Sequence, residues 1–526
     1  MRIGLIIAGD TAARWQLDAL MLLPTDTEII VLKATSPGPI APRRLFKHGA
    51  YYALNLTSVR EKKTSIRDFL RDARIIEFEP ETDGIWSKLP DSLLQRIRSQ
   101  NLDAIVKFGL SLLRVPPKSE LSVPILSYHH GDPRNFRGRP AGFYETKHRR
   151  ESVGQMVQQI SNKLDAGRVL AFAETPVFPY SYKKTLATAR ALSPQLLPRA
   201  LTALAEGQSV PIGATGRNYQ LPSNGSVVRF AATMGWEKLK RAFYGGFVEK
   251  KWRVSMMTAN GSGLSASIQA LEESAETWRT LDHPEQYTFI ADPCFDRRGE
   301  GVLVEAMEAL TGLGRIARIN GSEFVRIDEE RFHLSYPLNF QSSGEHLVLP
   351  EMVAGGKQKI FRLNNDVMEQ ASEVSITAEG LIDPTVLERG DGFYLFANDT
   401  ADGPSVLRLW TSDALDSDFT EHPASPIRVS TRGSRMAGPI LEEDGKLYRS
   451  GQDFRRAYGD GLFLFEIEVL SRESYRERQT DHLSFENRSG PHTLDVFGDQ
   501  ILFDWYDEKV SPFAGLRRIK AKLARR

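Results

Sequence analysis

The chain has 526 residues, more than one hydrophobic core normally supports, so at least two domains are expected. Its composition, 41% hydrophobic and 26% charged, is that of an ordinary globular protein. Lysine plus arginine total 68 and aspartate plus glutamate total 67, a balance that argues against nucleic-acid binding driven by bulk charge. Cys294 is the single cysteine, which excludes a disulfide framework and a cysteine-based zinc site and favours a reducing compartment.

The N-terminal run MRIGLIIAGD predicts a buried first strand. It lacks the charged segment and the long apolar segment of a signal peptide. No stretch of the sequence approaches the roughly 20 apolar residues that a membrane-spanning helix needs. We therefore expect a cytoplasmic protein.

Residues 1–215 alternate between two kinds of segment. The short apolar runs are rich in β-formers and are bounded by polar residues, proline or glycine; they are IGLIIAG, TEIIVLK, ARIIEFE, DAIVKFG and PILSYHH. Between them, segments such as PDSLLQRIRSQ place apolar residues at helical spacing. This alternation predicts βαβ units and an α/β domain with a mostly parallel sheet.

The stretch 216–250 differs from the sequence on either side. GRNYQLPSNGS is typical of a loop, and WEKLKRAFYGGF predicts a basic, partly amphipathic helix, so we interpret the stretch as a linker helix. A docked linker and a contact with a membrane interface both explain this pattern. The basic C-terminal sequence GLRRIKAKLARR, which contains the tail 521–526, suits either a solvated, frayed end or attraction to an acidic membrane surface.

Residues 251–520 are rich in β-formers and contain an internal repeat. Five segments share one design, in which a residue before proline is followed by an apolar run, a glycine turn and a second apolar run. The repeat prolines are Pro293, Pro337, Pro384, Pro439 and Pro491, at intervals of 44, 47, 55 and 52 residues. A four-stranded blade needs about 40–50 residues, so the repeat predicts an all-β five-bladed propeller rather than a β-sandwich.

The repeat also predicts a ring of polar side chains at one mouth of the propeller channel. Equivalent positions of the repeat carry acids or amides in several blades, and equivalent positions of a closed propeller surround one axis. We expect a glycan-binding mouth lined by Asp292, Glu305, Glu351, Asp383, Gln452 and Asp453, with Arg435 offsetting the repulsion of the carboxylates. The competing hypothesis is that these acids bond to backbone amides and hold the ring closed.

One stretch of the α/β domain carries a recognisable pattern. His129 ends an apolar run, Arg137-Gly138 lies eight residues after it, and Leu164-Asp165-Ala166-Gly167 follows. Over roughly residues 1–210 the sequence resembles the folate-dependent formyltransferases. The resemblance implies a Rossmann-like domain and 10-formyltetrahydrofolate as the formyl donor. We expect no metal site. The resemblance also implies catalytic roles for His129 and Asp165 and a folate pocket formed by Phe108, Gly109, Leu110, Ser111 and Leu112.

The chemistry of that family explains these residue types. An amine attacks the formyl carbon, a hydrogen-bond donor stabilises the resulting oxyanion, and a base accepts the proton of the amine. By resemblance, His129 polarises the carbonyl or moves the proton, and Asp165 orients the imidazole and receives charge.

This sequence departs from the family at one catalytic position. Ser127 stands where the family has asparagine, and a hydroxyl cannot place an amide N–H at the same point. Three explanations stay open: the site reacts differently, the neighbouring His130 compensates, or the domain has lost catalysis. A zinc site made of His129, His130 and Asp132 is disfavoured, because adjacent side chains on a strand point to opposite faces.

The propeller repeats carry a second resemblance, over roughly residues 250–520. Segments such as FIADPCF, FHLSYPLNF and SGPHTLD resemble the N-terminal domain of plant glucosamine inositolphosphorylceramide transferases and, more generally, five-bladed propeller glycoside hydrolases. The hydrolase resemblance implies Asp292 as a catalytic carboxylate, Asp383 as its modulator and Glu351 as the acid. The alternative is that they bind sugar hydroxyls or cap strands. Arg435 and His492 suit either a ligand phosphate or carboxylate, or a structural role.

Three functions follow from these patterns. The leading hypothesis is formyl transfer to an amino sugar or nucleotide-linked sugar in the synthesis of surface polysaccharide, with the propeller binding the sugar, glycan or glycolipid. The second is a silent formyltransferase fold joined to a glycan-binding propeller, which Ser127 motivates. The third is a glycosidase or glycosyltransferase centred on the propeller.

Overall fold

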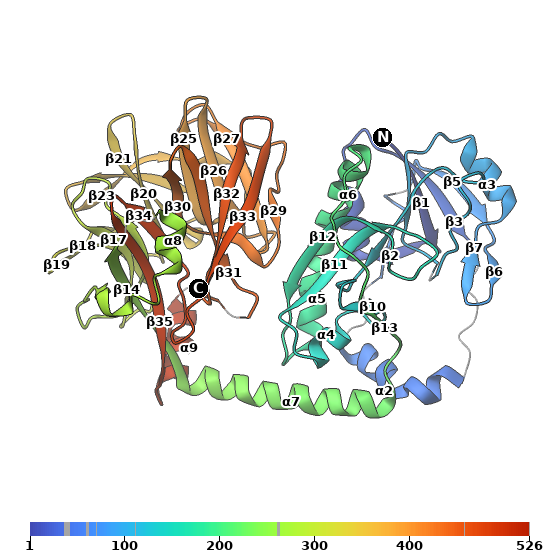
Figure 1. The fold of residues 1–526 in the computed structure, drawn as a ribbon, viewed down its shortest axis with the longest axis horizontal. Coiled ribbons are helices and arrows are strands. Elements are labelled where there is room, and N and C mark those ends of the chain that lie inside the picture. The colour runs from blue at the N-terminus through green and yellow to red at the C-terminus, as the bar shows by residue number, and fades with distance from the viewer. Residues whose placement is uncertain are drawn as a thin grey trace. The chain divides into compact units, whose positions relative to one another are not determined.

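The computed structural model describes residues 1–35, 43–58, 63–69, 71–110, 112–259, 263–456 and 458–524. The chain divides into two compact units, Met1–Leu239 and Lys240–Arg526, and each has its own sheets and its own core (Figure 1). In the part of the chain so described, no helix is both long enough and apolar enough to cross a membrane.

The first unit is built on a seven-stranded sheet of order β12-β11-β9-β8-β1-β3-β5. Its strands are β1 (Arg2–Ala8), β3 (Glu28–Ala34), β5 (Arg74–Phe78), β8 (Ala104–Lys107), β9 (Ile125–His129), β11 (Ser152–Gln159) and β12 (Arg168–Pro176). The five strands from β5 to β9 are parallel, and β11 and β12 join the β9 edge antiparallel. The mostly parallel sheet expected from the sequence is thus confirmed. Its central strands are largely apolar because both of their faces are covered.

Helices and short strands complete this unit. The helices are α1 (Arg14–Met21), α2 (Arg43–Ser58), α3 (Asp91–Arg98), α4 (Phe143–Lys147), α5 (Tyr182–Leu192), the 3₁₀ turn η1 (Ser193–Gln195) and α6 (Leu196–Ala205). The short strands are β2 (Thr11–Ala13), β4 (Lys63–Ser65), β6 (Glu81–Asp83), β7 (Trp86–Lys88), β10 (Phe136–Gly138) and β13 (Arg217–Tyr219). Helix α3 shows the sequence logic: Leu93, Leu94 and Ile97 share its buried face, and Asp91 lies in its first turn, where the helix dipole favours a negative charge.

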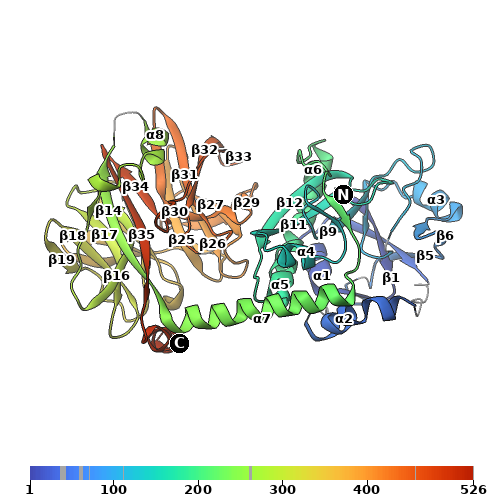
Figure 2. The same cartoon turned by 60° about the horizontal axis from the view of Figure 1, so that its bottom comes forward.

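Helix α7 (Asn224–Phe247) lies inside the stretch 216–250 that was interpreted as a linker helix, and both ribbon views draw it as one unbroken helix (Figure 2). Near its start, Val227 and Phe230 are buried in a cluster that includes Phe143 and Tyr182. Several of its other apolar side chains are exposed, namely Val228, Trp236, Leu239, Phe243 and Phe247.

The second unit is a five-bladed β-propeller, as the repeat predicted. Four blades are continuous in sequence: β16 (Tyr287–Phe295), β17 (Val302–Glu308), β18 (Gly314–Asn320) and β19 (Glu323–Arg326); β20 (Ser335–Ser342), β21 (Glu345–Glu351), β22 (Lys359–Asn364) and β23 (Val367–Glu373); β25 (Leu381–Arg389), β26 (Gly392–Asp399), β27 (Val406–Ser412) and β28 (Asp418–Glu421); β30 (Arg432–Glu443), β31 (Lys446–Asp453), β32 (Leu462–Leu470) and β33 (Tyr475–Leu483). The third blade also carries β24 (Ser375–Ile376) and β29 (Arg428–Val429).

The fifth blade joins the two ends of the unit. It is made of β34 (Leu494–Phe497), β35 (Gln500–Val510), β14 (Val248–Thr258) and β15 (Arg279–Thr280). The first strand of the unit therefore pairs with the last one, from Val248↔Val510 to Thr258↔Gln500. This pairing closes the ring of blades, and closure protects sheet edges that would otherwise attract other strands.

Four short helical segments and one boundary differ from the sequence interpretation. The segments are α8 (Leu264–Gln269), η2 (Ala275–Thr277), η3 (Val353–Gly355) and α9 (Ala514–Ala524). The last propeller strand ends at Val510 rather than near residue 520, and α9 follows it where a frayed tail was one expectation. Helix formation there is favoured because alanine, leucine, lysine and arginine are all good helix formers.

The residue before each repeat proline has a left-handed backbone. The φ angles are +48° at Asp292, +47° at Tyr336, +48° at Asp383, +122° at Gly438 and +130° at Gly490. The pairing register shifts at this point in the first four blades, so each innermost strand bends there. A tyrosine with positive φ is rare, and such strain persists where surrounding structure imposes it, commonly at functional sites.

Candidate functional sites

His129 and Asp165 meet at the carboxyl edge of the parallel sheet. His129 is the last residue of β9, and Asp165 lies in the loop between β11 and β12 with a φ of +45°. The Nδ1 atom of His129 is 3.4 Å from Oδ1 of Asp165, and the side chains are only 8% and 15% exposed. The backbone N–H of Gly138 donates to Oδ2 of Asp165 at 2.7 Å, so both oxygens of the carboxylate have a partner.

The second ring nitrogen of His129 also has a partner in the fold. Its Nε2 atom lies 3.2 Å from the backbone carbonyl oxygen of Phe136. A Cβ atom on Gly131 would lie 2.6 Å from this nitrogen, so only glycine leaves room for the ring here. An imidazole held between two oxygens has a fixed orientation, which a group that moves protons in a reaction requires.

Ser127 and Lys107 lie on neighbouring strands of the same edge. Ser127 precedes His129 by two residues in β9, so the two side chains point to the same face of the sheet. Ser127 is buried, and its hydroxyl donates to the carbonyl oxygen of Tyr128 at 3.4 Å. Lys107 ends β8 and pairs in register with Ser127. The site therefore holds a serine, a lysine, a histidine and an aspartate.

Lys107 was not among the predicted site residues. Burial lowers the pKa of its ammonium group to about 8, against the opposing effect of Asp165. Its Nζ atom donates to the carbonyl oxygen of Leu110 at 2.8 Å, which ties the candidate folate loop to the site. The available signal was a single lysine inside the apolar run DAIVKFG, since a charge within a buried strand usually has a specific role.

The candidate folate loop is fixed by its backbone. The N–H groups of Phe108 and Gly109 both donate to the carbonyl oxygen of Ile6 at 2.9 Å. Leu110 has a positive φ of 58°, and the carbonyl oxygen of Leu112 accepts from Ser87 at 2.7 Å. Ser111 lies outside the described residues. These backbone groups are therefore paired within the fold, and they hold the loop beside the carboxyl ends of β1 and β8.

His130 is turned away from this site. Its Nε2 atom lies 2.8 Å from the hydroxyl oxygen of Ser193, and its ring packs edge-on against Trp15. Burial lowers its pKa to about 3, so it remains neutral. Asp132 is bound by Arg134 and Asn135. The suggestion that His130 replaces the missing asparagine is therefore corrected, because the alternation of the strand sends it to the opposite face.

A small cavity opens beside His129. It is lined by His129, Gly138, Arg139, Tyr144, Glu145 and Tyr219, among others. Burial raises the pKa of the Glu145 carboxyl, on helix α4, to about 8, which keeps this group protonated at neutral pH. Sequence reasoning missed Glu145, and a lone glutamate in GFYETK gives no signal of its burial.

In the propeller, Asp383 and Arg435 form the centre of a polar cluster. Arg435 donates to Asp383 through Nε and, at 3.0 Å, through Nη2. The same guanidinium group lies 3.6 Å from Glu351, and Gln452 donates to Asp383 at 2.8 Å. The repulsion expected among these carboxylates is thus offset by one arginine, whose side chain is 19% exposed.

A second group is centred on His492. Its Nε2 atom lies 3.0 Å from Asp292 and its Nδ1 atom 2.6 Å from Asp504. Burial acts to lower the pKa of His492, but the two carboxylates prevail and raise it to about 10. Because both ring nitrogens of His492 face carboxylates, neither is free to bind a ligand phosphate. A structural role therefore describes His492 better than a ligand-binding role.

The side chains of Asp292, His492 and Asp504 lie close enough to one another to hold a metal ion. A protonated histidine between two carboxylates already balances most of their charge, and a metal would have to displace that proton. The protonated histidine and the two carboxylates therefore balance one another's charge without an ion.

The pKa values of two carboxyl groups in the propeller, on Glu351 and Asp292, are shifted in opposite directions. Burial, reinforced by the charge of Asp383, raises the pKa of Glu351 to about 8. Burial acts in the same sense on Asp292, but the charge and hydrogen bond of His492 prevail and hold its pKa below the ordinary value. Such a separation is the pattern by which one carboxyl serves as an acid while another stays ionised.

The remaining predicted residues lie in two different places. Glu305 is buried, and its Oε1 atom lies 3.7 Å from Nε2 of His333. In the sheet it pairs with Ala291 on the neighbouring strand. Asp453 makes its contacts away from the cluster, with Arg455 and with His482 at 2.9 Å. The expectation that Asp453 lines the mouth is corrected for a simple reason: it follows Gln452 on one strand, so the two side chains point to opposite faces.

Tyr458 joins the two groups and was not predicted. Its hydroxyl oxygen lies 3.0 Å from Nε2 of His492, and the guanidinium carbon of Arg435 is 5.1 Å from the centre of its ring. Tyr458 is 42% exposed, so it covers the cluster from the solvent side. It comes from the segment between β31 and β32, where YGDG reads as an ordinary loop.

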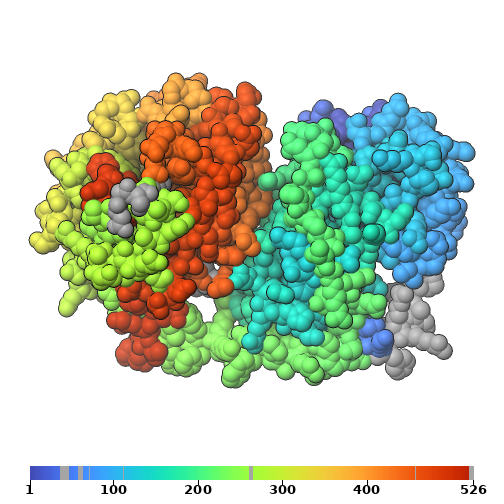
Figure 3. All heavy atoms as spheres, in the orientation of Figure 1, coloured from blue at the N-terminus to red at the C-terminus, as the bar shows by residue number. Residues whose placement is uncertain are grey.

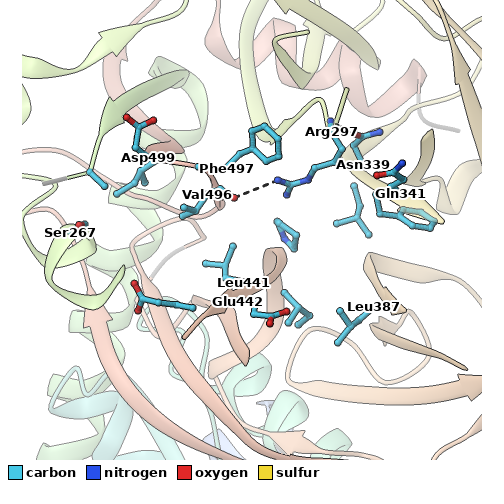
Figure 4. Close-up of a pocket in the computed structure, with 18 of the residues that line it drawn as sticks. Ser267, Arg297, Asn339, Gln341, Leu387, Leu441, Glu442, Val496, Phe497 and Asp499 are labelled. Carbon is cyan, nitrogen blue, oxygen red and sulfur yellow. Dashed lines mark hydrogen bonds between the residues drawn. The ribbon is translucent and has the colours of Figure 1, made fainter. Parts of the chain in front are cut away.

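The opposite end of the inner strands encloses a larger cavity of about 980 Å³ (Figure 4). Its wall contains Arg297, Asn339, Leu387, Leu441 and Val496, from all five innermost strands or the turns that follow them. Arg297 is held there by Asp495 and by the carbonyl oxygen of Val496 at 3.4 Å. The polar cluster and this cavity therefore belong to different ends of the innermost strands.

Part of the second unit is similar in sequence to a known protein family. Residues 321–495 match the family described as glucosamine inositolphosphorylceramide transferase 1, N-terminal. Glucosamine inositolphosphorylceramide transferase 1 of Oryza sativa subsp. japonica is 30% identical over 204 residues, which cover 36% of this chain and 27% of that protein. The Arabidopsis thaliana protein is 30% identical over 171 residues, 31% of this chain and 22% of that protein. The resemblance noted in the propeller repeats is confirmed, and the chain spans about a quarter of the length of these relatives.

Solved structures similar to this chain include two transferases. Glycinamide ribonucleotide transformylase 1 from Symbiobacterium toebii is 17% identical, covers 42% of this chain and 93% of its own, and has a TM-score of 0.29. A sugar N-formyltransferase from Shewanella is 11% identical, covers 44% of this chain and 87% of its own, and has a TM-score of 0.29.

Proposed function

We propose that the protein transfers a formyl group from 10-formyltetrahydrofolate to the amine of an amino sugar or nucleotide-linked sugar, and that the propeller binds the glycan. The observation that carries the proposal is the buried pair of His129 and Asp165 at the carboxyl edge of the parallel sheet. Ligands of open α/β sheets bind at that edge. The relatives that match the propeller are named for a glucosamine transferase, and glucosamine carries the primary amine that this reaction consumes.

The residues of the site have distinct tasks in this proposal. The amine nitrogen attacks the formyl carbon and forms the new carbon–nitrogen bond, while the carbon–oxygen double bond opens to an oxyanion and the nitrogen loses a proton. The oxyanion then re-forms the double bond, the bond between the formyl carbon and N10 of the folate breaks, and N10 takes a proton as tetrahydrofolate leaves. His129 receives or delivers that proton, and Asp165 balances the charge that develops on the imidazole. The ammonium group of Lys107, on the strand beside Ser127, offers the oxyanion an N–H donor in place of the amide N–H that the serine lacks.

The test is formyl transfer by the full chain. The protein is incubated with 10-formyltetrahydrofolate and a panel of nucleotide-linked amino sugars, and mass spectrometry detects the mass of one added formyl group. His129→Ala should lower the rate by at least about 100-fold, because a positioned acid–base group contributes roughly 10²–10⁴-fold.

The matched control is His283→Ala, which removes a half-buried histidine of the second unit. Transfer at the same rate in His129→Ala and the wild type would place the reaction elsewhere. A wild type that binds the folate but modifies none of the sugars would favour a silent fold.

A second candidate function rests on the propeller alone. The raised pKa of Glu351 and the lowered pKa of Asp292 favour an acid and an ionised carboxylate for cleavage or transfer of a glycosidic bond. Turnover of aryl glycosides without folate should then be abolished by Glu351→Gln and by Asp292→Asn. Turnover should persist in Asp453→Asn, whose side chain contacts Arg455 and His482. Equal loss in all three variants would indicate a structural effect and contradict this assignment.

A further inference from the structure

Two helices meet at one corner of the second unit. Strands β14 and β35 pair along their full lengths, and Val248 lies opposite Val510 at one end of the pair. Helix α7 enters β14 at this end, and α9 follows β35 from the same end (Figure 1). The space-filling view shows the red C-terminal residues against the green end of α7 (Figure 3).

Specific contacts fix this corner. Arg518 of α9 donates to the carbonyl oxygens of Tyr244, Gly245 and Val248 at 3.0, 2.7 and 2.6 Å. The carbonyls of Tyr244 and Gly245 belong to the end of α7, where no further helical turn can satisfy them, and Val248 is the first residue of β14. Arg517 pairs with Glu249 at 2.8 Å, and the N–H of Ser511 donates to the carbonyl oxygen of Phe247 at 2.7 Å. The relative placement of the two helix ends is therefore set by their own hydrogen bonds.

The corner exposes apolar side chains that its own contacts leave uncovered. We call the following set the corner surface: Phe243, Phe247, Val510, Phe513, Leu516 and Ile519. Their exposed fractions run from 44% at Phe247 to 77% at Val510. Leu516 and Ile519 lie three residues apart on one side of α9, and Phe513 immediately precedes the helix, while Ala514 is buried and Arg518 reaches α7.

Positive charge surrounds the corner surface. Lys240 and Arg241 precede it in α7, Lys509 precedes it in β35, and Lys520 follows it in α9, and all four side chains are exposed. Two acids lie at the same corner: Glu249 pairs with Arg517, and Glu508 accepts a hydrogen bond from the hydroxyl of Tyr244. Aromatic and aliphatic side chains set among lysines and arginines are typical of surfaces that lie in the interface of an anionic bilayer.

We propose that the corner surface docks on an anionic lipid bilayer, with its aromatic and aliphatic side chains at the acyl boundary and its cations against the headgroups. The charge decides between this occupant and a second copy of the chain. A symmetric contact between two copies would bring like charges together, which costs free energy, whereas anionic headgroups neutralise them. A glycan-modifying protein held at a membrane would meet acceptors that are themselves anchored there.

The test is sedimentation of the full chain with phosphatidylcholine vesicles that contain phosphatidylserine at about 30% or none. We expect binding to the anionic vesicles and its loss at high salt. Lys509→Gln with Lys520→Gln should weaken the affinity by about 30-fold, from about 1 kcal/mol for each cation. Phe513→Ser with Leu516→Ser and Ile519→Ser should abolish binding.

The matched control is Leu310→Ser with Val353→Ser and Val367→Ser, three exposed apolar side chains on other blades. This variant should bind like the wild type, and every variant should keep its melting temperature because the substituted side chains are exposed. Binding that ignores phosphatidylserine would overturn the proposal. So would a stable dimer, in light scattering without vesicles, that the serine variant of α9 dissociates. Either result leaves the formyl-transfer assay unaffected, so the two proposals fail separately.

Discussion

His492 shows how a single residue carries charge through the centre of the propeller. It is 1% exposed and lies between Asp292 and Asp504, two acids from different blades. Removing the histidine leaves two buried carboxylates without their shared cation, which is costly in a protein interior. The stability of the ring should therefore depend on the protonation of this one imidazole.

The pH dependence of stability tests this role. The pKa of His492 rises from 6.5 to about 10 on folding, so the folded state binds the proton more tightly than the unfolded state. The contribution of His492 to the free energy of unfolding is then complete below pH 6.5 and is lost as the pH rises toward 10. His492→Gln should lower the free energy of unfolding at pH 6.5 and flatten its decline up to pH 10, measured by urea denaturation.

His283→Gln is the control, since His283 is only half-buried and its Nδ1 atom lies 3.1 Å from the carbonyl oxygen of the adjacent Pro284. This variant should follow the wild type at each pH. If His492→Gln declined with pH as steeply as the wild type, the proton between the two carboxylates would not stabilise the fold.

At the scale of elements, the bend at the start of each innermost strand needs a device to hold it. In the second blade that device is Tyr336, whose hydroxyl accepts from the N–H of Gly438 at 2.8 Å and contacts its carbonyl oxygen at 2.9 Å. The hydroxyl oxygen of Thr385 lies 2.8 Å away. One side chain thus links the innermost strands of three blades.

Tyr336→Phe should destabilise the propeller by about 1–3 kcal/mol, because the buried N–H of Gly438 loses its hydrogen-bond partner. The positive φ at this position stays equally strained in both residues, so the difference reports the hydroxyl alone. Tyr394→Phe is the comparison, because the hydroxyl of Tyr394 donates to Asp391 in the adjacent turn between β25 and β26 and so does not link different blades. Urea denaturation that ranks Tyr336→Phe as the milder change would argue against this account.

At the scale of the whole molecule, closure of the ring depends on one strand from the start of the second unit. Strand β14 covers β35 from Val248 to Thr258, and the buried side chains of Val254 and Met257 belong to it. Without β14 the last blade would expose an edge and part of its core.

Two fragments test this dependence. A fragment of residues 240–526 should unfold in one cooperative transition. A fragment that begins at residue 263 lacks β14 and should be aggregated or lack a cooperative transition, as followed by calorimetry and light scattering. Cooperative unfolding of the shorter fragment at the same temperature would mean that β14 is dispensable.

The sequence by itself determined the two architectures, because local patterns encode them. The alternation of apolar runs with helical segments predicted the parallel sheet, and five prolines at blade-like intervals predicted five blades. The resemblance of its motifs to those of the formyltransferases also indicated His129 and Asp165 as partners. Their contact at 3.4 Å depends on the loop after β11 returning to the end of β9.

The tertiary structure decided what depends on contacts between distant segments. The lowered pKa of Lys107 and the raised pKa values of Glu145 and Glu351 follow from burial, which no local pattern specifies. The closing strand β14 precedes the five repeats and bears no repeat proline. The separation of Gln452 from Asp453 follows from strand alternation, once the register of β31 is fixed by its neighbours. Local sequence thus set the elements, and only packing set which charges share an environment.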